Sequence, residues 1–210
     1  MLMIQKFVVN PIEESTYILY DDTREALIVD CGALYEEEQE RIRQYINKHQ
    51  LMVVGHLLTH SHFDHIFGAD FIYKQYGVKP SMHEAELLTY EQAAAQMQSF
   101  IGNAFRLIVP PAGQLFKDFD EVKCGQHVLS VIPTPGHTQG GVCYYCAAEN
   151  VLLSGDTLFY RSIGRTDLFG GNYETLITSI KQRLFCLPPS TKVYPGHGSS
   201  TTIGDEMRMF

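Results

Sequence analysis

Three histidines and an aspartate lie within six residues of one another in the stretch Thr59-His60-Ser61-His62-Phe63-Asp64-His65. In an extended chain every second side chain points to the same side, so His60 and His62 can bind one metal ion. Asp64 and His65 come where an apolar run of helical character begins, which places them to face a second metal. Imidazole and carboxylate together favour zinc, iron or manganese over calcium or magnesium. The stretch predicts a metal-binding loop.

Three further ligand-type side chains occur later in the chain in a shared context. Each follows a short apolar stretch that reads as a strand and ends in glycine: His137 in P-G-H-T, Asp156 in S-G-D-T and His197 in G-H-G. Taken singly, each is explained equally well as a turn residue, because Gly and Pro favour turns. The repeated context, together with the loop, predicts that all three join one metal centre.

Strands and helices must position these residues, and the hydrophobic periodicity predicts both. Strands are predicted at 2–9, 15–20, 25–29, 52–58, 78–82, 127–132, 142–146 and in the short stretches before Asp156 and His197. Helices are predicted at 35–49, from 66 onward, at 83–100 and at 173–185. The segment 101–117 is irregular, and it is either a plain connection or a cover over a neighbouring site. His56 is predicted to be packed, and His127 to be exposed.

Size and composition limit the classes of protein that fit. The 210 residues, 45% of them hydrophobic, suit one sizeable core and predict a single domain over residues 1–210. The net charge of −8 offers no basic surface for nucleic acid or for an anionic membrane. No stretch approaches the roughly 18 consecutive apolar residues of a membrane span, and the N-terminus lacks the features of a signal peptide. We expect a cytoplasmic protein that acts on a small molecule; the sequence gives no indication of its oligomeric state.

The cysteines support the same compartment. Five of them form an odd set without the spacing of a disulfide framework, which predicts reduced thiols. Cys143 and Cys146 make one C-x-x-C, but within a predicted strand this spacing puts them on opposite faces.

Taken together and in this order, T-H-S-H-F-D-H, P-G-H-T, S-G-D-T and G-H-G resemble the metallo-β-lactamase superfamily. Within it, the chain is most similar to the single-domain glyoxalase II-like (hydroxyacylglutathione hydrolase-like) hydrolases. The resemblance covers essentially the whole chain. It implies an α/β fold (α+β in some schemes): a four-layer αβ/βα sandwich of two mixed sheets with helices outside and the metals at one edge between the sheets.

The resemblance also implies roles for particular residues. One metal would be held by His60, His62 and His137, the second by Asp64, His65 and His197, and Asp156 would bridge both. The implied enzyme is a binuclear hydrolase with two zinc ions, iron or manganese being possible substitutes. It would hydrolyse a thioester with a hydroxide held between the metals, because bound cations bring the pKa of water from 15.7 toward about 7. Asp64 would also orient this nucleophile and carry its proton.

The substrate and the close relatives leave alternatives open. Arg165, in I-G-R-T-D, lies where the family tends to place a basic residue for the glutathione moiety, although a structural salt bridge with Asp167 is the rival explanation. Glyoxalase II itself has a C-terminal helical domain that contacts glutathione, whereas 13 residues follow His197 here. The lactamase branch generally lacks the bridging aspartate, so Asp156 argues against antibiotic hydrolysis. The alternatives are a mononuclear iron persulfide dioxygenase, with His60, His137 and Asp156 as iron ligands, and a lactonase-like hydrolase.

Overall fold

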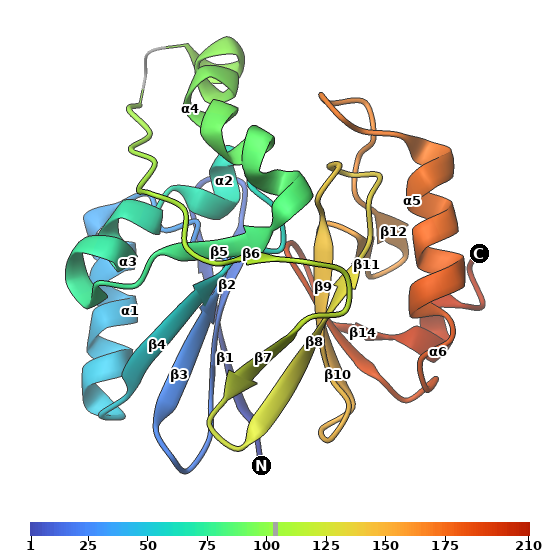
Figure 1. The fold of residues 1–210 in the computed structure, drawn as a ribbon, viewed down its shortest axis with the longest axis horizontal. Coiled ribbons are helices and arrows are strands. Elements are labelled where there is room, and N and C mark those ends of the chain that lie inside the picture. The colour runs from blue at the N-terminus through green and yellow to red at the C-terminus, as the bar shows by residue number, and fades with distance from the viewer. Residues whose placement is uncertain (103–104) are drawn as a thin grey trace.

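Two six-stranded sheets lie face to face, and helices cover their outer faces, in the computed structural model, which describes residues 1–102 and 105–210 (Figure 1). The first sheet has the strand order β1-β2-β3-β4-β5-β6, and the second has the order β14-β13-β10-β9-β8-β7. Strands β11 and β12 form a small third sheet. Both large sheets mix parallel and antiparallel pairs. The predicted sandwich of two mixed sheets with helices outside is confirmed.

The strands and helices have the following bounds. The strands of the first sheet are β1 (Met3–Val9), β2 (Glu14–Tyr20), β3 (Glu25–Val29), β4 (Met52–Leu57), β5 (Pro80–His83) and β6 (Leu115–Phe116). The other strands are β7 (Glu121–Cys124), β8 (His127–Pro133), β9 (Val142–Cys146), β10 (Val151–Gly155), β11 (Leu158–Phe159), β12 (Ser162–Ile163), β13 (Lys192–Pro195) and β14 (Thr201–Thr202). The α-helices are α1 (Glu36–Lys48), α2 (Phe63–Ile66), α3 (Ala69–Tyr76), α4 (Leu87–Ile101), α5 (Tyr173–Ser179) and α6 (Ile203–Glu206). A 3₁₀ turn, η1 (Glu84–Glu86), precedes α4, and a π-helical turn, η2 (Ile180–Leu184), follows α5.

The strands of the first sheet are apolar on both faces because each face is covered. Along β2, Tyr17 and Leu19 point into the core between the two sheets, whereas Ile18 and Tyr20 point toward the helices outside. Helix α1 covers that outer face with Ile42 and its neighbours, and α3 packs beside it (Figure 1). This burial on both faces explains why the strands read as nearly continuous hydrophobic runs.

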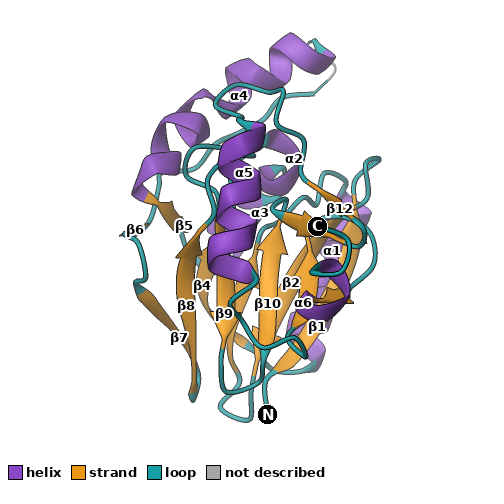
Figure 2. Ribbon diagram, turned by 90° about the vertical axis from the view of Figure 1, so that its right-hand side faces the viewer, coloured by secondary structure: helices purple, strands orange, loops and turns teal. Residues whose placement is uncertain are grey.

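The second sheet is built in the same way. Cys146 of β9 faces the core between the sheets and Cys143 faces the helical layer, so the predicted opposite orientation of this pair is confirmed. Leu176 of α5 and Ile180 of η2 cover the outer face of this sheet, and Figure 2 shows α5 in front of it. All five cysteines are free thiols.

Strand direction brings the predicted ligands to one edge of the sandwich. Strand β10 is parallel to β13 and antiparallel to β9, and β9 is antiparallel to β8, so β8, β10 and β13 all end at the same edge. His137, Asp156 and His197 follow these three strand ends. The loop after β4 meets the second sheet here, where the Val142 N–H donates to the Thr59 carbonyl over 2.9 Å.

Two predictions about single elements need comment. His127 is not exposed as predicted: its side chain retains only 10% of its exposure because the carboxylates of Asp21 and Glu149 enclose it. In the irregular segment 101–117, residues 103–104 lie outside the described residues, and β6 forms within its last part. Among the described residues, none of the helices has the length and apolar character needed to cross a membrane.

Candidate metal centre

The structure brings all seven predicted ligands together at this edge of the sandwich. Three overlapping groups each present ligand atoms within 4.8 Å of one another: His60, His62 and His137; His60, His65 and Asp156; Asp64, His65 and His197. They come from the loop after β4, from α2, and from the ends of β8, β10 and β13. Their roles as ligands remain predictions, and their convergence is what a metal centre requires.

The first triad is formed by His60, His62 and His137. The His62 Nδ1 lies 2.9 Å from the His137 Nε2, which lies 3.2 Å from the His60 Nε2. All three side chains are buried. Three imidazole nitrogens directed at one point form a set that suits zinc or another transition metal.

The second triad lies beside the first, and Asp156 stands between them. Its Oδ1 lies 3.3 Å from the His65 Nε2, while its Oδ2 lies 3.6 Å from the His137 Nε2 and 3.7 Å from the His197 Nε2. Asp64 Oδ2 lies 3.2 Å from the His197 Nε2 and 3.6 Å from the His65 Nε2. One carboxylate thus faces histidines of both triads, as a bridging ligand would.

Four of the histidines predicted as ligands are oriented through their other ring nitrogen. His137 Nδ1 donates to the Arg165 carbonyl over 2.7 Å, and His197 Nδ1 donates to the Ile12 carbonyl over 3.0 Å. His60 Nδ1 lies 3.2 Å from the Thr59 hydroxyl, and His65 Nδ1 lies 3.1 Å from a carboxylate oxygen of Asp30. In each of the four, Nε2 is left to face the centre. Such outer contacts fix the tautomer and the ring orientation of a metal ligand.

Asp30 supports both triads from the end of β3. It accepts from the Thr59 backbone N–H and hydroxyl, each over 2.7 Å, and it contacts His65 directly. Because Thr59 in turn contacts His60, one buried carboxylate orients a histidine of each triad. Asp30 has a φ of 55°, a left-handed conformation that aspartate tolerates better than most residues.

Glu86 joins the two loops that supply the first triad. Its Oε1 accepts from the Ser61 N–H over 2.9 Å and from the Ser61 hydroxyl over 2.7 Å. Its Oε2 accepts from the Thr138 hydroxyl over 2.7 Å and from the Gly140 N–H over 3.0 Å. Each oxygen of this fully buried carboxylate therefore holds one loop. Gly140 allows the close approach, because a Cβ there would lie 2.2 Å from the Glu86 nitrogen.

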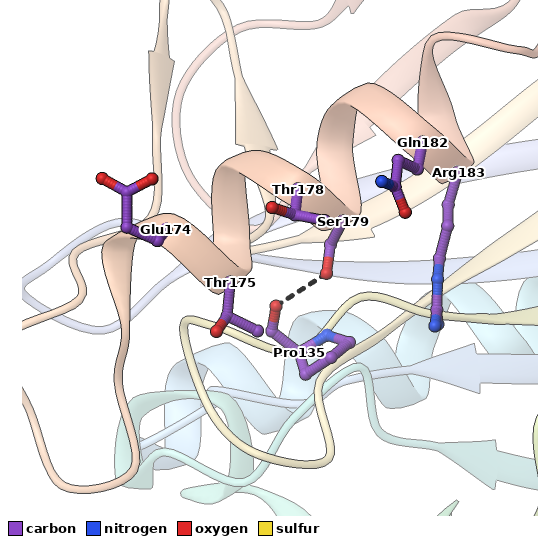
Figure 3. A pocket seen from close by; sticks show the side chains of 7 residues that line it. All are labelled: Pro135, Glu174, Thr175, Thr178, Ser179, Gln182 and Arg183. Carbon is purple, nitrogen blue, oxygen red and sulfur yellow. Dashed lines mark hydrogen bonds between the residues drawn. The ribbon is translucent and has the colours of Figure 1, made fainter.

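Helix α5 holds the turn that presents His137. The Ser179 hydroxyl donates to the Pro135 carbonyl over 2.8 Å (Figure 3), and the Asn172 N–H donates to the Gly136 carbonyl over 2.8 Å. Gly136 has a φ of 133°, and a Cβ there would meet the backbone of Leu176 at 2.3 Å. The P-G-H-T sequence thus meets a steric requirement. The pocket in Figure 3 lies between Pro135 of this turn and residues of α5 and η2, and none of the predicted ligands lines it.

Glycine is equally required beside Asp156. A Cβ at Gly196 would lie 2.2 Å from Asp156 Oδ1 and 2.7 Å from His65 Cε1. A Cβ at Gly164 would lie 1.8 Å from the Asp156 carbonyl oxygen. The glycine of G-H-G therefore leaves the space in which the ligand groups meet.

The electrostatics of the first triad favour neutral imidazole, the form that binds metal. Burial, reinforced by the neighbouring His137, lowers the pKa of His62 to about 4. Burial, followed by the effect of His65 and His137, also lowers the pKa of His60 well below its ordinary value. In the second triad the carboxylates outweigh burial: although burial opposes it, Asp156 and Asp64 raise the pKa of His65.

The buried polar atoms support a cation between the triads. Within residues 1–102 and 105–210, His65 Nε2 and Asp156 Oδ1 are buried and have no hydrogen-bond partner. Buried polar groups are normally paired, so two unpaired atoms aimed at each other need a further partner. The histidine and carboxylate set fits a transition metal. The residues present therefore fit the predicted metals.

Arg165 lies beside the centre and is paired with Asp167. Its Nε and Nη2 donate to the two Asp167 oxygens, each over 2.8 Å, so the salt bridge considered from the sequence is present. Arg165 also lines a cavity of about 200 Å³ that opens over the predicted ligands. The two explanations of Arg165 are therefore compatible.

Sequence reasoning missed three buried carboxylates around the ligands. Asp30 follows an apolar strand, as Asp156 does, but its glycine comes after it rather than before it, so it carried only part of that signal. Glu86 lies where acidic residues commonly start a helix, and Glu14 lies within a strand; neither pattern points to a metal centre. Glu14 accepts from the Gly32 N–H over 2.9 Å, and its Oε1 lies 3.8 Å from His65 Nδ1.

Comparison with known proteins gives the following relatives. The sequence model of the family described as "Metallo-beta-lactamase superfamily" matches residues 11–197. The Bacillus subtilis (strain 168) protein "Probable metallo-hydrolase YqgX" is 36% identical over 199 residues, covering 95% of this chain and 92% of the relative. "Hydroxyacylglutathione hydrolase GloC" of Haemophilus influenzae is 33% identical over 207 residues, covering 98% of this chain and 95% of the relative.

Solved structures agree with this grouping. The BLEG-1 B3 metallo-beta-lactamase superposes with a TM-score of 0.89 at 37% identity, covering 98% of this chain and 97% of the other. The protein TTHA1623 in a di-iron-bound form gives a TM-score of 0.85 at 30% identity and covers 98% of each chain. ETHE1 from Myxococcus xanthus gives a TM-score of 0.79 at 27% identity, covering 99% of this chain and 82% of the other.

Proposed function

The chain belongs to the metallo-beta-lactamase superfamily and is a metallo-hydrolase of it, and we propose that it hydrolyses thioesters at a centre of two metal ions. One observation carries the proposal: two complete ligand triads adjoin, and Asp156 faces both of them. A mononuclear enzyme would need only one triad. The similarity to a hydroxyacylglutathione hydrolase supports the thioester as substrate.

In this proposal each predicted ligand has a defined metal-binding role. His60, His62 and His137 would hold one ion, Asp64, His65 and His197 the other, and Asp156 would bridge them. When bound, such ions lower the pKa of water and polarise a carbonyl oxygen. Zinc suits the histidine-rich first triad, and the di-iron form of one structural neighbour makes iron the main rival.

Asp64 has a second role in this proposal. It lines the cavity, and its pKa is lowered because His65 and a hydrogen bond from His197 outweigh the effect of burial. An ionised carboxylate at this place can accept a hydrogen bond from the attacking water and orient it toward the thioester carbonyl. Water then adds to the carbonyl carbon, the C–S bond breaks, and the proton passes by way of Asp64 to the departing thiolate. The products are a carboxylic acid and a thiol.

Arg165 is proposed to bind the thiol carrier. Asp167 takes its Nε and Nη2 donors, which fixes the guanidinium and leaves Nη1 for a carbonyl or carboxylate of the substrate. Its side chain is 58% exposed, so this contact lies at the mouth of the cavity.

The test combines metal content with three assays on one purified sample. We expect two metals per chain and hydrolysis of S-lactoylglutathione or another glutathione thioester. One iron per chain and oxygen uptake with glutathione persulfide would instead establish a dioxygenase. Turnover of a chromogenic cephalosporin without thioester hydrolysis would establish a lactamase, the activity that the name of one structural neighbour gives.

A matched pair of variants tests the two-metal requirement. His197→Ala removes a predicted ligand of the second triad and should reduce hydrolysis at least about a hundredfold. His49→Ala changes a histidine at the end of α1, outside every ligand group, and should leave hydrolysis unchanged. Full activity of His197→Ala would contradict the proposal.

A further inference from the structure

The cavity over the predicted ligands has apolar walls. Apart from the ligands, it is lined by Ile12, Phe63, Phe100, Leu168 and Arg165. The four apolar residues come from the β1–β2 turn, from α2, from the end of α4 and from the loop after β12. Four separate segments thus place apolar side chains around one polar centre.

These walls are not part of a closed core. Phe100 and Ile12 retain 56% and 53% of their exposure, and the Phe100 ring packs against the Phe63 ring at a tilt of 43°, with ring centroids 6.1 Å apart. Large apolar side chains left exposed beside a polar centre are typical of a ligand pocket. Phe100 and Ile12 both line the same cavity as five of the predicted ligands, His62, Asp64, His137, Asp156 and His197.

The size of the cavity decides which part of the substrate it holds. Its volume is about 200 Å³, below the roughly 300–1,000 Å³ of pockets that enclose a drug-sized ligand. A complete glutathione thioester exceeds that space. Only the group next to the scissile carbonyl fits beside the ligands, and the carrier extends past Arg165 at the mouth.

The chemistry of the walls then specifies that group. Arg165 is the only lysine or arginine among the described residues that line the cavity, and Asp167 neutralises it with two hydrogen bonds. Among the residues that the structure describes, the apolar walls Ile12, Phe63, Phe100 and Leu168 offer no side-chain hydrogen-bond donor or acceptor. A hydroxyl on the acyl group would lose its water there without gaining a partner from these walls.

We propose that the acyl half of the substrate is a plain aliphatic or aromatic chain, which Phe63, Phe100 and Leu168 enclose, rather than a hydroxyacyl group. This inference rests on the proposed thioester hydrolysis and narrows its substrate class. The step remains the addition of water and cleavage of the C–S bond, giving an apolar carboxylic acid and the free thiol.

A series of thioesters on one carrier tests the inference. S-acetyl-, S-butyryl-, S-hexanoyl- and S-lactoylglutathione differ only in the acyl group. A fully buried methylene gains about fourfold in binding and a half-buried one about twofold, so kcat/KM should rise at least about tenfold from acetyl to hexanoyl. S-lactoylglutathione should be hydrolysed more slowly than S-butyrylglutathione.

Two phenylalanine variants separate the cavity from the general surface. Phe100→Ala should flatten the dependence of kcat/KM on chain length by about threefold or more. Phe169→Ala is the control, because Phe169 is similarly exposed at 60% and does not line the cavity. Phe169→Ala should retain the full increase of kcat/KM with acyl chain length.

Product binding provides a readout that does not depend on turnover. Calorimetry on the metal-loaded protein should show hexanoate binding more tightly than lactate, with a negative heat-capacity change that Phe100→Ala reduces. If kcat/KM does not rise from the acetyl to the hexanoyl thioester, or if the lactoyl thioester is hydrolysed faster than the hexanoyl thioester, the inference is wrong. Either result is still compatible with the proposed thioester hydrolysis. If no thioester is hydrolysed, the proposed function fails, and the calorimetric preference alone then supports or overturns the apolar acyl site.

Discussion

Glu86 is expected to control the first metal triad without touching a metal. Its Oε1 holds the loop between His60 and His62, and its Oε2 holds the loop that follows His137. Glu86→Gln keeps the shape of the side chain but replaces one accepting oxygen by an NH₂ group. The loop that faces this group loses its acceptor, whichever way the amide turns.

The size of the effect follows from the contacts. A hydroxyl can rotate away from the NH₂ group, but the backbone N–H of Ser61 or of Gly140 cannot, and a buried donor without an acceptor costs about 1–3 kcal/mol. The free energy of unfolding of the metal-free protein should therefore fall by about 2 kcal/mol. Because residues that orient metal ligands typically contribute 10–100-fold in affinity, the dissociation constant of the His60, His62 and His137 triad should rise by about that factor.

The assay must separate metal binding from stability. Cobalt titration followed by visible absorption, in competition with a chelator, reports the two affinities, and urea unfolding reports stability. Tyr90→Phe is the matched control: it removes a hydroxyl on the neighbouring helix α4 that donates to the Pro110 carbonyl over 2.6 Å, away from both loops that Glu86 holds. It should cost about 1 kcal/mol and leave both affinities unchanged. If Glu86→Gln is destabilised but binds both metals as tightly as the unchanged protein, Glu86 supports only the fold, and the reasoning is refuted.

Three further outcomes are expected. His197→Ala should lower the metal content by elemental analysis to one ion per chain and reduce hydrolysis at least about a hundredfold, since one metal of the pair is lost. Asp30→Asn should weaken metal binding at the second triad about 10–100-fold in chelator competition, because Asp30 orients His65. For Asp21, burial would raise the pKa, but hydrogen bonds led by the Thr23 hydroxyl outweigh it and hold the pKa well below its usual range. Its stabilising contribution is therefore present above about pH 4 and is lost as the pH falls through the lowered value, so Asp21→Asn should show a shallower loss of stability in acid unfolding.

The convergence of the seven predicted ligands could be foreseen from the sequence because their contexts agree with one another, although His137, Asp156 and His197 taken singly are explained as well as turn residues. Histidines at 60, 62 and 65 in one short loop have no packing role, and His137, Asp156 and His197 share one context at strand ends. Strand direction then brings these ends together, as the order of the second sheet shows. Local sequence therefore predicts almost completely which side chains meet at this edge.

The residues that hold the ligands were not predictable in this way. Glu86 acts on Ser61 and Thr138, which are 25 and 52 positions away in the chain. At the start of a helix an acidic residue already has an ordinary explanation in the helix dipole, so its pattern carries no further signal. Such contacts depend on packing between distant segments.

Among the helices and strands, too, local patterns were predictable, whereas features that depend on contacts between distant segments were not. The long strands and α1 lie close to their predicted bounds because their hydrophobic periodicity is local. The predicted helix from residue 66 onward instead begins at Ala69, as α3, and a separate short helix, α2, ends at Ile66; Phe67 and Gly68 lie between them. A Cβ at Gly68 would lie 2.5 Å from the Cys31 sulfur, and the Gly68 N–H donates to the Cys31 carbonyl, so contact with the strand-end loop determines this break.

The proposed reaction can consequently be inferred from local sequence, whereas the proposed substrate class depends on how distant segments pack in the fold. A metal centre demands particular residue types at fixed strand ends, and those types are rare enough elsewhere to be recognised in the sequence. The cavity walls demand only apolar side chains, and Ile12, Phe63, Phe100 and Leu168 look in the sequence like any core residues. Because they gather only when four segments meet, the class of acyl group can be inferred from the folded chain alone, and substitutions in these walls should change the substrate without changing the reaction.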